Sequence, residues 1–150
     1  QGLMLASAES CTGGWFGQIV TSIPGSSAWY QSGFITYTAN AKQKMLGIST
    51  KTLKEYGEVS EQIAREMAHG VVARSSAQVS VSITGIAGPG GGTTKKPVGM
   101  VCFAWEIKDN HMRSETRHFS GDREAVRQQS VAVAMQGLIA LLRDTDHSVA

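Results

Sequence analysis

Short runs of apolar and β-branched residues recur along the chain between polar, glycine-rich segments. Runs of this length, bounded by turn residues, are typical of buried strands. The expected strands cover residues 2–8, 32–38, 78–86, 98–107 and 111–119. Because only the turn-forming pair Asp109 and Asn110 separates the last two strands, we expect them to form an antiparallel hairpin.

Between these runs, apolar residues three and four positions apart predict amphipathic helices. The expected helices cover residues 15–23, 39–46, 50–56, 60–74 and 122–143. Gly47 is expected to end the second helix, and Ser60 and Asp122 are candidate N-caps of the last two. Strands and helices alternate early and a hairpin precedes the last helix, so the chain is expected to be an α/β protein with a mixed sheet covered on both faces. We find no linker or internal repeat and expect residues 1–150 to form a single domain.

Composition narrows the possible partners. Hydrophobic residues make up 41% of the chain and charged residues 17%, as in globular proteins. The net charge is only +2 and basic residues are scattered, which argues against nucleic-acid binding. The most apolar segment, residues 131–142, is too short to span a membrane. The two cysteines, Cys11 and Cys102, form no disulfide framework, so we expect a cytoplasmic protein.

Residues 9–14, with the sequence ESCTGG, carry the first candidate chemistry. They follow an expected strand and lead into a helix, where ligands of α/β sheets bind and helix N–H groups favour an oxyanion. Gly13 and Gly14 would let a substrate approach the backbone. The segment therefore indicates Ser10 as a nucleophile, although an ordinary helix cap is the alternative. Cys11 competes with Ser10 because a helix N-terminus lowers the pKa of a thiol.

Tyr37 and Lys42 are the second candidates. Tyr37 lies near the end of an expected strand and Lys42 in the first turns of the next helix, so both can face one crevice. A serine nucleophile needs a base. Neutral Lys42 can serve if its pKa falls by about 3 units from about 10.4. Alternatively, charged Lys42 lowers the pKa of Tyr37 and the phenolate accepts the proton. If the two residues have no catalytic role, Tyr37 is an ordinary aromatic residue at a strand end and Lys42 a solvated lysine.

Residues 84–93, with the sequence TGIAGPGGGT, form a third candidate, a glycine-rich loop after a strand. The loop offers unhindered N–H groups but matches neither a P-loop nor a dinucleotide-binding motif, and a flexible connection is the alternative. The histidines have no ligand-like spacing, so we expect neither a metal nor a cofactor. They are His69, His111, His118 and His147.

Taken in order, these segments resemble the C-terminal domain of the CinA (competence/damage-inducible) family. The residues that carry the resemblance are spread over most of the chain. They are 8–14, 24–27, Tyr37 with Lys42, 46–47, Gly57, 59–60, 84–89, 96–99 and 121–123.

The resemblance implies an amidase that converts nicotinamide mononucleotide (NMN) and water to nicotinic acid mononucleotide and ammonia. It also implies a three-layer α/β/α sandwich with a mixed, mainly parallel sheet, a homodimer, and a metal-free centre of Ser10, Tyr37 and Lys42. The residues expected to bind the nucleotide substrate are Thr12, Gly13, Gly14, Ser27, Thr84, Gly85, Gly88 and Arg123.

The chain departs from the family at two places. The family usually has Tyr-Ser-Asn-x-x-Lys where residues 37–42 are YTANAK, so Ala39 replaces an asparagine that could cap the helix or contact substrate. The family domain also usually has a helix before its first strand, which is not in this sequence. Two alternative hypotheses are a catalytically silent nucleotide-binding relative and an amidase for another nucleotide-like amide.

Overall fold

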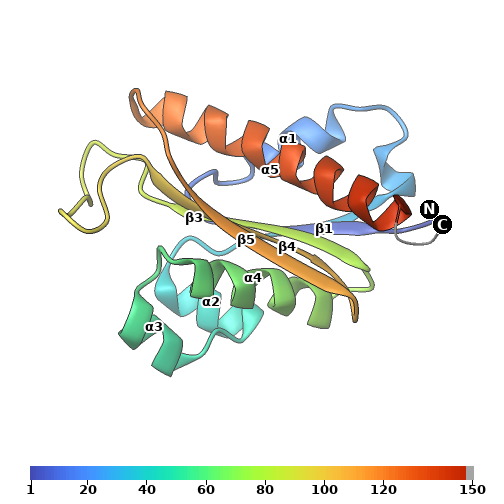
Figure 1. Ribbon diagram of the computed structural model, residues 1–150, viewed down its shortest axis with the longest axis horizontal. Helices are drawn as coiled ribbons and strands as arrows, with labels where there is room; N and C mark the ends of the chain where they lie inside the picture. The colour runs from blue at the N-terminus through green and yellow to red at the C-terminus, as the bar shows by residue number, and fades with distance from the viewer. Residues whose placement is uncertain (148–150) are drawn as a thin grey trace.

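The fold is an α/β arrangement in which one sheet separates two layers of helices (Figure 1). The computed structural model describes residues 1–147. The strands are β1 (Leu5–Glu9), β2 (Tyr30–Ile35), β3 (Val79–Gly85), β4 (Met100–Ile107) and β5 (His111–His118). The helices are α1 (Trp15–Thr21), the 3₁₀ helix η1 (Ser26–Ala28), α2 (Ala39–Leu46), α3 (Thr50–Tyr56), α4 (Glu61–Ala73) and α5 (Arg123–His147).

The sheet has the strand order β2-β1-β3-β4-β5. β1 pairs in parallel with β2 and β3, whereas β4 is antiparallel to both β3 and β5. It follows that β4 alone runs against the other four strands. The expected hairpin of β4 and β5 and the mixed, mainly parallel sheet are therefore confirmed.

The two faces of the sheet are covered by different helices. α1 and α5 lie on one face and α2, α3 and α4 on the other (Figure 1). Phe16 and Val20 of α1 are fully buried on the first side, and Ile63 and Met67 of α4 on the second. Burial of each such side chain stabilises the fold by about 1.5–3 kcal/mol. The expected three-layer α/β/α sandwich is confirmed.

Specific capping residues define the predicted helix ends. Gly47 ends α2 with a left-handed φ of 70°, a conformation that glycine adopts without steric cost. Ser60 Oγ accepts a 3.2 Å hydrogen bond from the N–H of Ile63, and Asp122 Oδ1 accepts one of 2.9 Å from the N–H of Ala125. All three predicted caps are confirmed. The last helix continues beyond the expected residue 143, to His147.

α5 lies close to the sheet because Gly137 faces Trp105 of β4. A Cβ atom at Gly137 would lie 2.1 Å from the indole ring. Trp105 Nε1 also donates a 2.9 Å hydrogen bond to the carbonyl of Ala134. The contact and the hydrogen bond fix α5 across the sheet. Within residues 1–147, no helix has the length and apolarity needed to span a membrane.

A second close contact joins α2 to α4. A Cβ atom at Gly70 of α4 would lie 2.4 Å from the carbonyl oxygen of Leu46, the last residue of α2. Lys42 and Leu46 are one turn apart and both are buried, so they share the inner face of α2. The absence of a side chain at Gly70 thus helps set the position of Lys42.

We expect Gly70→Ala to lower the free energy of unfolding by about 1–3 kcal/mol, the usual cost of overpacking. Alanine favours a helix over glycine by about 1 kcal/mol, but the methyl group would meet a backbone carbonyl that cannot rotate away. Urea denaturation measures the effect. Gln62→Ala, on the exposed face of α4, is the control and should change stability by less than about 0.5 kcal/mol. A Gly70→Ala protein as stable as the native one would contradict this account.

Candidate active site

A pocket opens where β1, β2 and β3 end at one edge of the sheet. Its volume is about 240 Å³. Seven of the residues expected from the sequence line it, and four of the expected residues do not. The seven are Ser10, Tyr37, Lys42, Thr84, Gly85, Gly88 and Arg123. Four separate parts of the chain therefore converge on one site.

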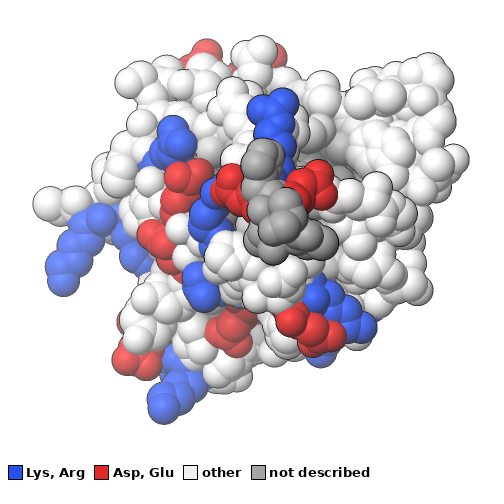
Figure 2. Space-filling model, turned by 45° about the vertical axis from the view of Figure 1, so that its right-hand side comes forward, with Lys and Arg blue, Asp and Glu red and all other residues white. Residues whose placement is uncertain are grey.

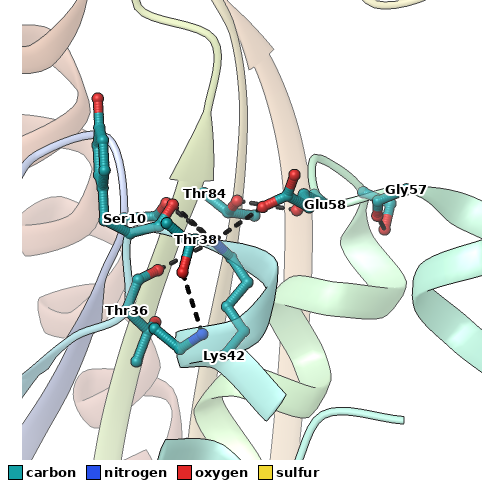
Figure 3. A network of polar contacts seen from close by, with 10 residues as sticks. Ser10, Thr36, Thr38, Lys42, Gly57, Glu58 and Thr84 are labelled. Atoms are coloured by element: carbon teal, nitrogen blue, oxygen red, sulfur yellow. Dashed lines mark hydrogen bonds and ion pairs between the residues drawn. The ribbon is translucent and has the colours of Figure 1, made fainter. Parts of the chain in front are cut away.

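The centre of the pocket is the amine of Lys42. Its Nζ donates hydrogen bonds to Ser10 Oγ at 3.0 Å and to the carbonyl of Thr36 at 2.9 Å (Figure 3). A longer bond of 3.5 Å reaches the carbonyl of Tyr37. The lysine is only 1% exposed. The amine is thus held against the serine hydroxyl by backbone acceptors at the end of β2.

The position of Lys42 is set by helix α2. Thr38 is the N-cap, and its Oγ1 accepts a 3.1 Å hydrogen bond from the N–H of Ala41. Ala39 is the first residue of the helix and is not its cap. The replacement of the family's asparagine by Ala39 therefore leaves the helix capped.

Burial lowers the pKa of Lys42 from its ordinary value because the ammonium form loses its hydration. The carboxylate of Glu58 opposes this change, since its Oε1 lies 3.6 Å from Nζ. Glu58 was not predicted from the sequence. It lies in the connection between α3 and α4, where a single acidic residue gives no local signal of a distant partner.

Ser10 directly follows β1 and is held by backbone hydrogen bonds. Its N–H donates to the carbonyl of Ile83 at 2.9 Å, which extends the β1–β3 pairing by one residue. Its carbonyl accepts a 3.0 Å hydrogen bond from the N–H of Gly13. Ser10 is 6% exposed and its side chain lines the pocket. The expected position of Ser10 at a strand end is confirmed.

The N-terminus of α1 is not the expected anion site. The carboxylate of Glu9, 2% exposed, accepts hydrogen bonds from the N–H groups of Phe16 at 2.8 Å and Gly17 at 3.2 Å. Thr12 Oγ1 donates to the same carboxylate at 2.6 Å. These helix N–H groups are therefore occupied, and the expectation that they stabilise an oxyanion at Ser10 is wrong. The role of Glu9 was not predicted from the sequence, because the orientation of its side chain depends on the folded loop.

Thr12, Gly13 and Gly14 shape the loop after Ser10 and do not line the pocket. Gly13 and Gly14 have left-handed φ values of 57° and 105°, which glycine permits at this turn. Arg127 of α5 fastens the loop by donating to the carbonyls of Cys11 at 3.0 Å and Thr12 at 3.2 Å. Arg127 was also not predicted from the sequence, because more than a hundred residues of chain separate it from Cys11 and Thr12.

Tyr37 and Arg123 meet at the rim. Arg123 donates through Nη2 to the hydroxyl of Tyr37 at 3.0 Å and through Nη1 to the carbonyl of Gly88 at 2.7 Å. Tyr37 is 57% exposed. Its hydroxyl is thus bonded to Arg123, and the structure shows no hydrogen bond from that hydroxyl to Ser10 or Lys42. This arrangement joins the glycine-rich loop to α5.

Ser27 lies apart from the pocket. It is exposed on η1, which precedes β2 and lies beside the start of β1, where the N–H of Leu5 donates to the carbonyl of Trp29 at 2.7 Å. Ser10 follows the other end of β1. Ser27 and Ser10 are therefore at opposite edges of the sheet in this chain.

Charge is dispersed on the face of the molecule that Figure 2 shows. The face shown in Figure 2 carries acidic and basic side chains interspersed, without a broad surface of one sign. Within residues 1–147, no three His, Cys, Asp or Glu side chains are grouped as metal ligands.

The fold and the pocket together define an α/β protein with a serine–lysine pair at the carboxyl ends of parallel strands. The family model of the CinA C-terminal domain matches residues 1–142. The chain belongs to this family.

Relatives and solved structures agree with this assignment. The chain is 49% identical to nicotinamide-nucleotide amidohydrolase PncC of Enterobacter agglomerans, over 91% of this chain and 83% of that protein. It is 47% identical to the protein of the same name from Escherichia coli K12, over 92% and 84%. The crystal structure of competence/damage inducible protein CihA from Agrobacterium tumefaciens superposes with a TM-score of 0.91 at 47% identity, over 93% of this chain and 86% of that one.

We expect Glu9→Gln to lower the free energy of unfolding by about 1–3 kcal/mol. Three donors point at the carboxylate, and the amide group of glutamine would place its own N–H donors against one of them. The urea midpoint should fall with an unchanged m-value. Glu55→Gln, an exposed residue on α3, is the matched control and should leave the midpoint unchanged. Equal midpoints for the two variants would show that Glu9 does not stabilise the loop.

Proposed function

We propose that this protein hydrolyses the amide of NMN to give nicotinic acid mononucleotide and ammonia, with Ser10 as the nucleophile. The observation that carries the proposal is the buried Lys42 amine 3.0 Å from Ser10 Oγ. The name shared by relatives at 47–49% identity supplies the substrate.

Neutral Lys42 accepts the proton of Ser10 as Oγ attacks the amide carbon. The resulting ammonium donates that proton to the amide nitrogen, the C–N bond breaks and ammonia leaves an ester on Ser10. Water then attacks the ester carbonyl, with Lys42 again accepting the proton and returning it to Ser10 Oγ. The N–H groups of Gly88, Gly90 and Gly91, which line the pocket within the glycine-rich loop, are our candidates for stabilising the oxyanion.

Lys42 is the immediate base in this mechanism, because its amine contacts Ser10 while the hydroxyl of Tyr37 contacts Arg123. Tyr37 then orients Arg123 at the rim. Two of the five N–H donors of the guanidinium are used by Tyr37 and Gly88, so others remain for the phosphate of the nucleotide.

We further propose that residues 1–150 act as one domain in a cytoplasmic homodimer. Cys11 and Cys102 are free and buried, as suits a reducing compartment. Light scattering of the purified protein measures its oligomeric state.

We expect Ser10→Ala to abolish ammonia release from NMN while leaving NMN binding measurable by calorimetry. Cys11→Ser, the neighbouring control, should stay active, because burial raises the pKa of Cys11 to about 11 and keeps its thiol protonated at neutral pH. The opposite result for the two variants would make Cys11 the nucleophile. NMN binding without turnover in the native protein would identify a silent nucleotide-binding relative, and turnover restricted to other amides would identify a different substrate.

We expect the native protein to have a kcat/KM for nicotinamide riboside about 10²-fold lower than for NMN, since the riboside lacks only the phosphate. A charged hydrogen bond contributes about 1.5–3 kcal/mol, which corresponds to that ratio. Arg123→Ala should reduce the preference, whereas Arg65→Ala, on an exposed part of α4 outside the pocket, should retain it. Equal kcat/KM values for the two substrates would mean that the protein does not recognise the phosphate. An unchanged preference in Arg123→Ala would mean only that Arg123 does not bind it.

A further inference from the structure

Glu58 lies on a main chain that is fixed from both sides. Its carbonyl accepts a 2.9 Å hydrogen bond from Thr84 Oγ1, at the end of β3. The carbonyl of the preceding Gly57 accepts one of 3.1 Å from Ser60 Oγ, the cap of α4. Thr84, which was expected to bind substrate, lines the pocket and also donates its hydroxyl to the Glu58 main chain. The connection between α3 and α4 therefore presents this carboxylate to the pocket.

The charges that surround Lys42 make Glu58 distinctive. Glu58 is the only carboxylate among the described residues that line the pocket. The thiol of Cys11 is close enough to interact electrostatically with Lys42, but burial raises the pKa of that thiol to about 11, so it is uncharged at neutral pH. Arg123 and Tyr37 lie at the rim and are bonded to each other. Among the described residues that line the pocket, Glu58 thus supplies the negative charge next to an ammonium on Lys42.

The reaction needs Lys42 to be neutral and yet basic enough to accept a proton. Burial by itself favours the neutral amine, but an amine that is too weak a base cannot take the proton of Ser10. A carboxylate 3.6 Å from Nζ stabilises the ammonium that forms in that step. Because the carboxylate is about half exposed, at 49%, solvent and salt screen the interaction and leave it moderate.

We propose that Glu58 is a positioning residue of the hydrolytic centre, which stabilises the ammonium form of Lys42 and thereby sets the pH range in which the Ser10–Lys42 pair works. This inference rests on the proposed amidase function. Glu58 acts through Lys42 and forms no bond with the reacting amide.

The first test is the pH profile of kcat/KM for NMN in native protein and in Glu58→Gln. Activity rises with pH as Lys42 loses its proton. Without the carboxylate the ammonium is less stable, so the rising limb should move to lower pH by about one unit. This value is the lower end of the pKa shift that a nearby opposite charge causes. The weaker base should also lower the high-pH plateau, by about threefold. Glu55→Gln, on the exposed side of α3, is the control and should reproduce the native profile.

The second test measures Lys42 directly and needs no turnover. In protein labelled with ¹³C-lysine, the Lys42 Cε signal is assigned by its loss in Lys42→Arg and then titrated. Its midpoint should fall by about one unit in Glu58→Gln and stay close to the native value in Glu58→Asp. This readout would not move if Glu58 served only to hold the loop.

An unchanged Lys42 midpoint in Glu58→Gln would overturn the inference. So would a higher KM with an unmoved rising limb, since that result would mean that Glu58 contacts the substrate. The Lys42 midpoint could fall in Glu58→Gln while the native protein releases no ammonia from NMN. That result would support the coupling of Glu58 to Lys42 and reject the proposed amidase function.

Discussion

The buried amine of Lys42 is the constraint on which the arrangement of this site depends. A charged or polar group that leaves water is costly unless hydrogen-bond partners replace its hydration. Here the partners are Ser10 Oγ, the carbonyl of Thr36 and, at a longer distance, the carboxylate of Glu58. Each comes from a different segment, so those segments must meet within a few ångströms. The cap at Thr38, the close contact at Gly70 and the hydrogen bond from Thr84 all serve to hold them there.

Parallel strand pairing explains why these segments meet. β1 and β2 run side by side and their last residues, Glu9 and Ile35, are in register. The N–H of Thr36 donates to the carbonyl of Glu9 at 2.9 Å, which places the chain after β2 beside the chain after β1. Lys42 follows within two turns of α2, so its long side chain can return to the strand ends. A serine and a lysine 32 residues apart become neighbours because the sheet aligns the two exits.

The features of the fold and the site that could be predicted from the sequence are those that neighbouring residues in the chain determine. The bounds of α2 and α3 were predicted correctly because glycines, Gly47 and Gly57, end both helices. The meeting of Ser10 and Lys42 followed from the strand-end rule for α/β sheets. Glu9, Glu58 and Arg127 escaped prediction because each acts through a side-chain direction or a partner that only the folded chain defines. The same reason explains the wrong expectation for α1: the sequence shows a helix start after Ser10 but does not show that Glu9 occupies it.

The contrast between Ser10 and Cys11 shows how the surroundings of an atom decide its chemistry. An isolated thiol is far more easily ionised than a hydroxyl, so composition alone would favour Cys11 as the nucleophile. In the folded chain the thiol loses this advantage. Burial raises the pKa of Cys11 to about 11, and the occupied N-terminus of α1 offers it no free N–H groups from Phe16 and Gly17. Ser10 instead has a buried amine within 3.0 Å, which can take its proton at the moment of attack. A hydroxyl hydrogen-bonded to a base is a better nucleophile than a protonated thiol that has no such bond, and this difference favours Ser10.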